Sequence, residues 1–474
     1  MRATRSTGRR RAAVIAGVVG LVGAVGIAAA LWVPSLAAPS PVPDGTPDPG
    51  ASLDLPTEPW WGGPEAFYSR FPVAAAAGWA DPGFFPIAVF FGRPVHAPEL
   101  AALGINTYMG VEYDGTTPVS TVTDEGISVL AHSEWSPAEV AGDPLVVGWH
   151  VSDECEMGYS GCTEDWTEDN GEDGRLAVQE QYVADLRALD DGRFLQANFG
   201  NGVLETYWAP TTMRDHVALM DVVSVDKYAF TSPSVRELLL TSPAWPTDAD
   251  PDSPGAYGWL QDQMEGFADP AGSTPNWVFV ETASPLLNEA GAEMIEPEQI
   301  SAAVWNAIIH GAAGIAYFQH NNMTCDTYSL IDCGRERSDA VAAINREVAS
   351  LATVINTPTF EWTFADDLDT AVKAKDGYAY ILAMPIGAGG ERTFSLPPQL
   401  SRGAAEVVGE DRSIPIGEDG FVDSFESDLQ HRVYRIQIRE APATDPAPEG
   451  AVAPAAVRPT SPTSPRSSRP GRRV

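Results

Sequence analysis

Short apolar runs alternate with stretches of helical periodicity through the first three quarters of the chain. Between the runs, residues 98–103, 175–189 and 297–313 carry apolar side chains at the spacing of one helix face. Apolar strands that alternate with helices predict a parallel sheet covered on both faces. The predicted strands are residues 86–91, 105–109, 127–131, 145–151, 194–198, 221–226, 277–281 and 314–319.

Eight strand–helix units predict a (β/α)8 barrel, the TIM barrel fold. An open, doubly wound sheet is the alternative, but no glycine-rich phosphate-binding turn follows the first strand. The barrel is expected to occupy residues 59–356.

The pattern changes after residue 356, where short strand-like segments lie between glycine, aspartate and proline turns. We expect a small antiparallel β-sandwich over residues 357–440. Its predicted strands are residues 370–374, 378–384, 392–396, 404–408, 413–416 and 431–438.

The N-terminus has the composition of a targeting segment. Five arginines within residues 1–11 precede an uncharged run over residues 12–33, and small residues follow at 35–37. The run is also long enough to span a bilayer, so residues 1–37 are expected to form a signal peptide or a signal anchor. Either would make the protein extracellular, secreted or anchored to the outer face of the cytoplasmic membrane. Residues 38–58 predict a Pro-rich linker, and residues 441–474 predict a disordered tail rich in Pro, Ser and Arg.

The charge balance is acidic, with 65 Asp and Glu against 29 Lys and Arg in 474 residues. Such a surface repels nucleic acid and anionic lipid, so no nucleic-acid partner is expected. A neutral carbohydrate suits this charge better than an anionic substrate does. An acidic surface can also serve solubility alone.

Four cysteines fit an exported protein, because an even number in that setting predicts disulfides. They are Cys155, Cys162, Cys325 and Cys333. Three pairings are possible. The two local bridges, 155–162 and 325–333, require the least from the rest of the fold, because they join cysteines that are close in sequence. Zinc binding by the four is a weaker alternative, because spacings of seven and eight residues exceed those of zinc motifs.

Two apolar runs lead into a glutamate, Glu154 after the fourth predicted strand and Glu281 at the end of the seventh. A carboxylate there is costly unless it is paired, hydrogen-bonded or used. The carboxyl ends of parallel strands meet at one mouth of a barrel, so the two side chains can face each other. Two facing carboxylates can cleave a glycosidic bond, with Glu154 as acid/base and Glu281 as nucleophile. Asp153 is a rival for the acid/base role.

Further polar and aromatic residues near predicted strand ends are candidates for binding sugar hydroxyls or stacking on sugar rings. Each could instead be a packing or loop residue. The candidates are Asp153, Trp149, Asn198, Asp226, Tyr228, Gln319 and His320. The sequence has no Gly-x-Ser-x-Gly, His-Glu-x-x-His or Walker motif and only seven histidines, so no metal and no cofactor are expected.

Residues 80–320 resemble the (β/α)8 glycoside hydrolases of clan A, most of all a bacterial branch related to families five and forty-two. In that clan the acid/base glutamate ends strand four, usually after an asparagine, and the nucleophile ends strand seven. Ser152-Asp153-Glu154 and Val280-Glu281-Thr282 match those positions. Residues 305–318 are similar to the clan's seventh helix and eighth strand, and a β domain often follows such barrels.

The departure from the clan is Asp153, where the clan usually has the asparagine that binds the sugar 2-hydroxyl. Two adjacent carboxylates repel each other and raise a pKa, which gives either a tuned acid or a site without activity. The resemblance implies an exported retaining glycosidase acting on an oligo- or polysaccharide. The alternative is a non-catalytic barrel for carbohydrate binding or cell-wall association.

Overall fold

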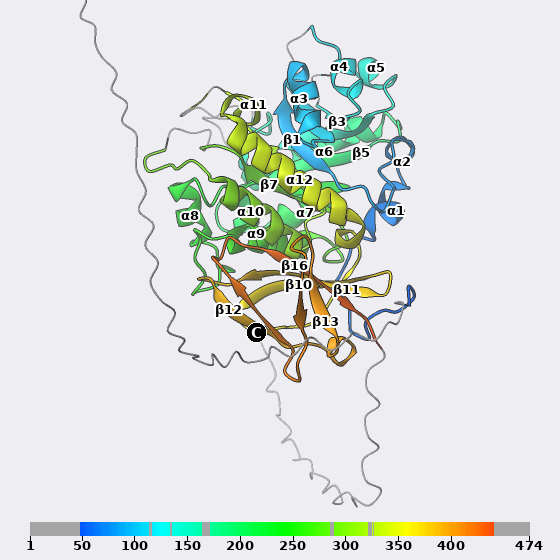
Figure 1. The fold of residues 1–474 in the computed structure, drawn as a ribbon. Coiled ribbons are helices and arrows are strands. Elements are labelled where there is room, and N and C mark those ends of the chain that lie inside the picture. The colour runs from blue at the N-terminus through cyan, green and yellow to red at the C-terminus, as the bar shows by residue number, and fades with distance from the viewer. Residues whose placement is uncertain are drawn as a thin grey trace, which may run out of the picture. The chain divides into compact units, whose positions relative to one another are not determined.

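The computed structural model describes residues 48–112, 116–132, 135–163, 171–284, 289–320, 325 and 327–439. Eight parallel strands follow one another around a closed barrel, and β1 completes the ring by pairing with β8 (Figure 1). This confirms the predicted (β/α)8 barrel. The strands are β1 (Ile87–Gly92), β2 (Thr107–Val111), β3 (Ser128–Ala131), β4 (Val146–Asp153), β5 (Phe194–Phe199), β6 (Val222–Val225), β7 (Asn276–Glu281) and β8 (Gly314–Phe318).

The barrel strands are buried on both faces, which is why their sequences are apolar without alternation. One set of side chains, including Phe90, Phe194 and Phe279, fills the interior. The intervening set, including Val89 and Leu195, packs between the strands and the surrounding helices. Strand β4 departs from regular alternation, because its register with β5 shifts between His150 and Ser152.

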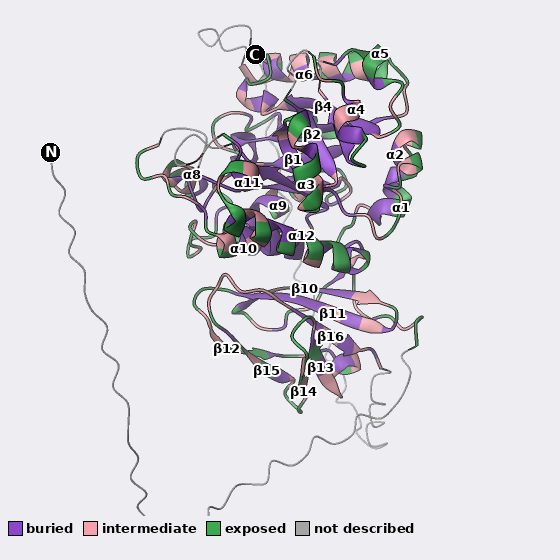
Figure 2. Cartoon of the chain, turned by 45° about the horizontal axis from the view of Figure 1, so that its top comes forward, coloured by how far each residue is buried: buried purple, intermediate pink, exposed green. Residues whose placement is uncertain are grey.

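Helices surround the barrel with buried inner faces and exposed outer faces (Figure 2). The three predicted helices are present as α3, α6 and α10. Long helix α12 has the apolar periodicity of an amphipathic helix but was not among the predictions. The α-helices are α1 (Gly63–Tyr68), α2 (Pro72–Ala76), α3 (Ala97–Ala102), α4 (Ser120–Thr123), α5 (Pro137–Val140), α6 (Gly171–Arg187), α7 (Met213–Ala218), α8 (Pro233–Leu239), α9 (Gly255–Phe267), α10 (Pro297–Ile309), α11 (Ser329–Asp332) and α12 (Arg335–Ile355). Short 3-10 helices are η1 (Pro94–His96), η2 (Cys155–Met157), η3 (Asn201–Leu204) and η4 (Pro398–Leu400).

The C-terminal region is an antiparallel sandwich, as predicted. A six-stranded sheet in the order β14-β13-β16-β11-β10-β9 lies with a two-stranded sheet, β12-β15. Their shared core includes Phe394 stacked on Phe421, with ring centroids 4.4 Å apart, and Tyr434. The strands are β9 (Thr359–Phe360), β10 (Leu368–Lys375), β11 (Tyr378–Pro385), β12 (Gly390–Phe394), β13 (Ala404–Val407), β14 (Arg412–Pro415), β15 (Phe421–Phe425) and β16 (Arg432–Gln437). Strands β9 and β15 were not predicted.

The end of the predicted linker packs on the sandwich. Leu53 belongs to the sandwich core, and Thr57 forms an antiparallel bridge with Phe360 of β9. The amide of Glu58 donates to the carbonyl of Thr359 at 3.0 Å. Thr57 therefore adds a single bridge at the edge of the sheet formed by β9.

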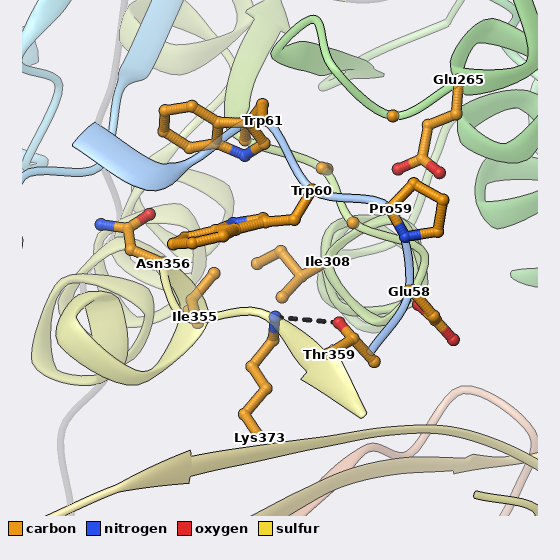
Figure 3. Close-up of a pocket in the computed structure, with 14 residues that line it drawn as sticks. Glu58, Pro59, Trp60, Trp61, Glu265, Ile308, Ile355, Asn356, Thr359 and Lys373 are labelled. Carbon is orange, nitrogen blue, oxygen red and sulfur yellow. Dashed lines mark hydrogen bonds between the residues drawn. The ribbon is translucent and has the colours of Figure 1, made fainter. Parts of the chain in front are cut away.

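Just beyond this segment, Trp60 and Lys373 of β10 line a small cavity of about 30 Å³ (Figure 3). The Lys373 ammonium donates to the carbonyl of Thr357 and the hydroxyl of Thr359. Burial lowers the pKa of Lys373 to about 8, against the opposing charges of Glu58 and Glu265. The cavity lies beside Ala313, immediately before β8, so it is at the amino ends of the barrel strands, away from the predicted site.

Both local disulfides are present, Cys155–Cys162 and Cys325–Cys333. The first closes the segment directly after Glu154. The predicted signal segment, the first part of the linker (38–47) and the tail (441–474) lie outside the described residues. Within the part of the chain that is described, no helix combines the length and apolarity needed to cross a membrane.

Candidate active site

Glu281 is the last residue of β7 and is 1% exposed. The hydroxyl of Tyr257 on α9 donates to both of its carboxylate oxygens, at 2.8 and 2.9 Å. The hydroxyl of Thr231 donates to one oxygen at 3.2 Å. Burial raises the pKa of Glu281 to about 7, although these hydrogen bonds oppose the shift. Among the described residues, Glu281 is therefore held by neutral donors rather than by a cation.

The two acids at the end of β4, Asp153 and Glu154, have different surroundings. Asp153 is in register with Asn198 of β5, whose amide nitrogen donates to Asp153 Oδ1 at 2.9 Å. Burial, and then the charge of Glu154, raise the pKa of Asp153 to about 7. A carboxyl group with this pKa holds its proton in weakly acidic solution, as a general acid must.

Glu154 follows the strand in a left-handed backbone conformation, with φ 49°. Its amide donates to the carbonyl of Asn198 at 2.9 Å, which ties the turn to the end of β5. The Lys227 ammonium, just after β6, lies 3.2 Å from Glu154 Oε1. Both side chains are mostly buried, with 7% of Lys227 and 17% of Glu154 exposed. Lys227 and Glu154 therefore form a mostly buried ion pair.

Tyr228 is affected by the charges of both glutamates. Its hydroxyl donates to Asp226 Oδ2 at 3.2 Å, and its ring stacks on Phe318 of β8. The pKa of Tyr228 is raised well above its usual value by burial first and then by the charges of Asp226, Asp153, Glu154 and Glu281. The charges of carboxylates at the ends of β4, β6 and β7 therefore all act on the phenol of Tyr228.

A hydrogen-bonded chain of buried side chains crosses three strands and ends at Asp153. The Gln196 amide nitrogen donates to Ser224 Oγ at 2.9 Å, and Ser224 donates to Asn198 Oδ1 at 2.8 Å. Asn198 then donates to Asp153. At the other end, His150 Nδ1 lies 2.7 Å from Gln196 Oε1. The predicted residue Asn198 is therefore placed to position Asp153.

Several residues of the site were not predicted. Glu156 is fully buried, and its Oε1 accepts from the amides of Gly200 and Gly202 at 2.7 and 3.3 Å. Burial, and then the charge of Glu154, raise the pKa of Glu156 to about 8. Tyr257 and Lys227 were also not predicted as partners of the glutamates. Tyr257 bonds Glu281 across a sequence separation of 24 residues, and Lys227 bonds Glu154 across 73 residues. Such distant contacts cannot be read from the local sequence.

Three predicted binding residues make no hydrogen bond with Asp153, Glu154 or Glu281 within the described part of the chain. Trp149 packs in the layer between strands and helices, where its indole nitrogen donates to Asp191 at 3.0 Å. It is therefore not among the residues gathered around Tyr228. Gln319 is buried, and neither polar atom of its side chain has a hydrogen-bond partner among the described residues. His320 lies beside Phe318 and Tyr328, and burial lowers its pKa.

Among the described residues, no group of three or more His, Cys, Asp and Glu side chains is arranged to hold a metal ion. The site consists of carboxyl groups, one ammonium, hydroxyls and aromatic rings. Such a set can transfer protons and supply a carboxylate nucleophile.

The fold and site define a (β/α)8 barrel protein with carboxylates at the C-terminal ends of β4 and β7. No protein-family model matches the chain, and no curated protein matches its sequence. Solved structures with a similar fold include a β-galactosidase from Bacillus circulans, with TM-score 0.48 and 9% identity over 74% of this chain and 99% of that one. A family 5 glycoside hydrolase from Bacteroides vulgatus has TM-score 0.45 and 10% identity over 75% and 90% of the two chains.

A cold-adapted β-galactosidase from a Rahnella species has TM-score 0.41 and 13% identity, over 59% of this chain. The match spans only 58% of that enzyme's length. These likenesses concern the fold and carry no argument about activity.

Proposed function

We propose that the protein is a retaining glycoside hydrolase with Glu281 as its nucleophile. The observation that carries the proposal is the state of Glu281. It is a buried carboxyl group at the carboxyl end of a barrel strand, held by the hydroxyls of Tyr257 and Thr231, with no ion-pair partner among the described residues. A buried carboxylate without a cation is costly and marks a functional candidate.

The acid/base role is assigned to the Asp153–Glu154 pair rather than to Glu154 alone. Lys227 forms an ion pair with Glu154, and burial together with the charge of Glu154 keeps a proton on Asp153 up to about pH 7. Asp153 would protonate the leaving oxygen while Glu281 attacks the anomeric carbon. A double displacement of this kind requires the two carboxyl groups to lie about 5–5.5 Å apart.

The test is turnover of a panel of activated aryl glycosides, together with labelling by 2-deoxy-2-fluoro glycosides. Glu281→Gln is expected to lose at least about a thousandfold in turnover, because the nucleophile acts as part of a unit. The fluorosugar should attach to Glu281, as mass spectrometry of the labelled peptide would show. The matched control is Glu298→Gln, an exposed acid in the first turn of α10. If a sugar turned over by the native protein is turned over equally by Glu281→Gln, the assignment is wrong.

A non-catalytic carbohydrate-binding barrel is the second candidate. It is favoured by the ion pair between Glu154 and Lys227 and by the near-complete burial of Glu281. Such a protein would bind glycans but neither turn over any aryl glycoside nor accept a fluorosugar label.

We further propose that the protein works outside the cytoplasm, with a carbohydrate as its partner and membrane anchoring through residues 1–37 as one form of export. The two disulfides support this location, because such bridges persist in oxidising compartments. Cell fractionation with antibodies against the sandwich would separate a secreted form from an anchored one.

A further inference from the structure

A groove of about 400 Å³ lies between the barrel and the sandwich, and neither Glu154 nor Glu281 lines it. Its barrel wall comes from α9, α10 and the loop before α9, residues 245–254. Its sandwich wall comes from β10, β11 and Asp428. Helix α10 packs against β10 and β11 (Figure 1), so the groove belongs to the interface between the two parts of the fold.

The walls of the groove are partly aromatic and apolar. Trp245 and Trp259 line it on the barrel side, with ring centroids 4.9 Å apart in an edge-to-face arrangement. Ile386 lines it on the sandwich side and is 56% exposed, although it is a large apolar residue. Tryptophan rings attract cations to their faces, and the planar guanidinium group of arginine stacks well on them.

The groove is also strongly acidic. Its only positively charged lining residue is His310, against five aspartates: Asp248, Asp250, Asp262, Asp369 and Asp428. Burial lowers the pKa of His310, but the charges of Asp369 and Asp262 raise it well above its usual value. His310 pairs with these two aspartates, at 3.0 and 2.9 Å. The charge of His310 is therefore shared by two of the five carboxylates.

The other three aspartates, at positions 248, 250 and 428, form no ion pair among the described residues. Arg236 lies close to this loop in sequence, but it pairs with Asp252 at 3.0 Å. The groove thus presents three carboxylates next to a pair of tryptophan rings. This combination suits a partner that carries several guanidinium groups.

The chain itself contains such a partner. Residues 450–474 include five arginines and no acidic residue. Four of these arginines fall within residues 466–473, which have the sequence Arg-Ser-Ser-Arg-Pro-Gly-Arg-Arg.

The length of the chain allows this segment to reach the groove. Strand β16 ends at Gln437, which pairs with Tyr378 at one end of β11, whereas Met384 near the other end of β11 lines the groove. Six residues of strand separate the two ends, which corresponds to about 20 Å. Arg466 follows Arg439, the last described residue, by 27 residues. A stretch of that length can span up to about 90 Å.

We propose that residues 466–473 dock in this groove of their own chain. Their arginines stack on Trp245 and Trp259 and pair with the three aspartates that His310 does not bind. Because the segment and the groove belong to one chain, docking is intramolecular and does not depend on protein concentration. The proposal is independent of the proposed hydrolysis, since the groove lies outside the candidate active site.

Docking is measured in the full chain with a bimane label on Ser468→Cys, because tryptophan quenches bimane on contact. All four native cysteines are in disulfides, so the label attaches to the introduced thiol. The groove variant carries Asp248→Asn, Asp250→Asn and Asp428→Asn together. It should raise the bimane emission at least about twofold, because the attraction that holds the segment is removed.

A second variant, in which all four arginines of residues 466–473 become glutamine, should raise the emission equally. It leaves the described residues unchanged, which keeps the test valid if the groove variant does not fold. The matched control neutralises three exposed acids outside the groove, with Glu99→Gln, Glu298→Gln and Asp339→Asn, and should leave the emission unchanged. A label on Thr444→Cys, only five residues beyond Arg439, should not respond to the groove variant.

The proposal is overturned if the folded groove variant or the arginine variant leaves the emission of the label at position 468 as low as in the parent. It is also overturned if the control raises the emission as much as the groove variant does. Quenching that increases with protein concentration would contradict docking within one chain, because the segment would then occupy the groove of a second copy. Turnover of aryl glycosides plays no part in these measurements, so their outcome and that of the hydrolase test are separate.

Discussion

Lys227 Nζ lies 3.2 Å from Glu154 Oε1 and 3.7 Å from Asp226 Oδ1. One ammonium therefore compensates carboxyl groups from the ends of two strands, β4 and β6. The pKa of Lys227 is raised by Asp226, Glu154 and Glu156, in that order, against the opposing effect of burial. The acidic cluster depends on this single cation more than on any other described side chain.

Replacing Lys227 with methionine should destabilise the protein by about 3–5 kcal/mol at pH 8, the cost of leaving a buried charge without its partner. The loss should be smaller at pH 5, because the pKa of Asp226 is already raised by burial and its protonation removes one unpaired charge. Urea unfolding at both pH values measures the difference. Lys227→Arg keeps the charge and should retain more of the stability. Equal losses for Lys227→Met at both pH values would contradict this account.

Removing the Tyr257 hydroxyl should change the titration of Glu281. The two hydrogen bonds from Tyr257 lower the pKa of Glu281, so Tyr257→Phe should raise that pKa above about 7. A nucleophile must be ionised, and the rising limb of the activity profile should therefore move to higher pH. The pH dependence of kcat/KM shows the shift. Tyr317→Phe, which removes a hydroxyl bonded to Asn345, should leave the limb in place.

The raised pKa of Glu156 makes the stability of the folded protein depend on pH in a direction that can be predicted. Its folded-state pKa of about 8 exceeds the ordinary value of 4.5, so the folded protein keeps a proton that the unfolded chain has released. Stability is lost as pH rises through that window, at no more than about 1.4 kcal/mol per pH unit for one group. Glu156→Gln cannot ionise and should show a smaller fall in unfolding free energy between pH 5 and 8. A fall as large as that of the native protein would rule out this role.

Gly200 provides a steric test of the Glu154 position. A Cβ on Gly200 would lie 2.0 Å from Glu154 Oε1 and 2.7 Å from the sulfur of Met157. Gly200→Ala should therefore displace the Glu154 carboxylate from Lys227 and lower both stability and any turnover. Gly266→Ala is the control, because its Cβ meets nothing within 4 Å on helix α9. This control should stabilise by about 0.5–1 kcal/mol. Crystals of Gly200→Ala with Glu154 unmoved would refute the steric account.

The strands were predictable because burial on both faces leaves an uninterrupted apolar signal. It was harder to predict which face of its strand each side chain occupies. The register shift in β4 between His150 and Ser152 separates Trp149 from Asp153 in a way that simple alternation does not reveal. The location of Glu281 at a strand end followed from the sequence, whereas its partner Tyr257 did not, because it comes from a helix that precedes β7.

The glutamate–lysine pair shows the same limit. No cation stands near Glu154 in sequence, and Lys227 reaches it only because β4 and β6 end at the same mouth. Strand β9 was missed because two residues carry too little pattern. It pairs with β10 on one side and forms a single bridge with the distant residue Thr57 on the other.

That distant pairing has a consequence for how the molecule reaches its native state. Leu53 and Ile436 share one apolar core, so the sandwich draws on chain segments that flank the entire barrel. Contacts between such remote segments form slowly, since the intervening loop must first be closed. The sandwich should therefore be completed last during synthesis. A fragment that starts at residue 59 should lack the segment that pairs with the edge of β9.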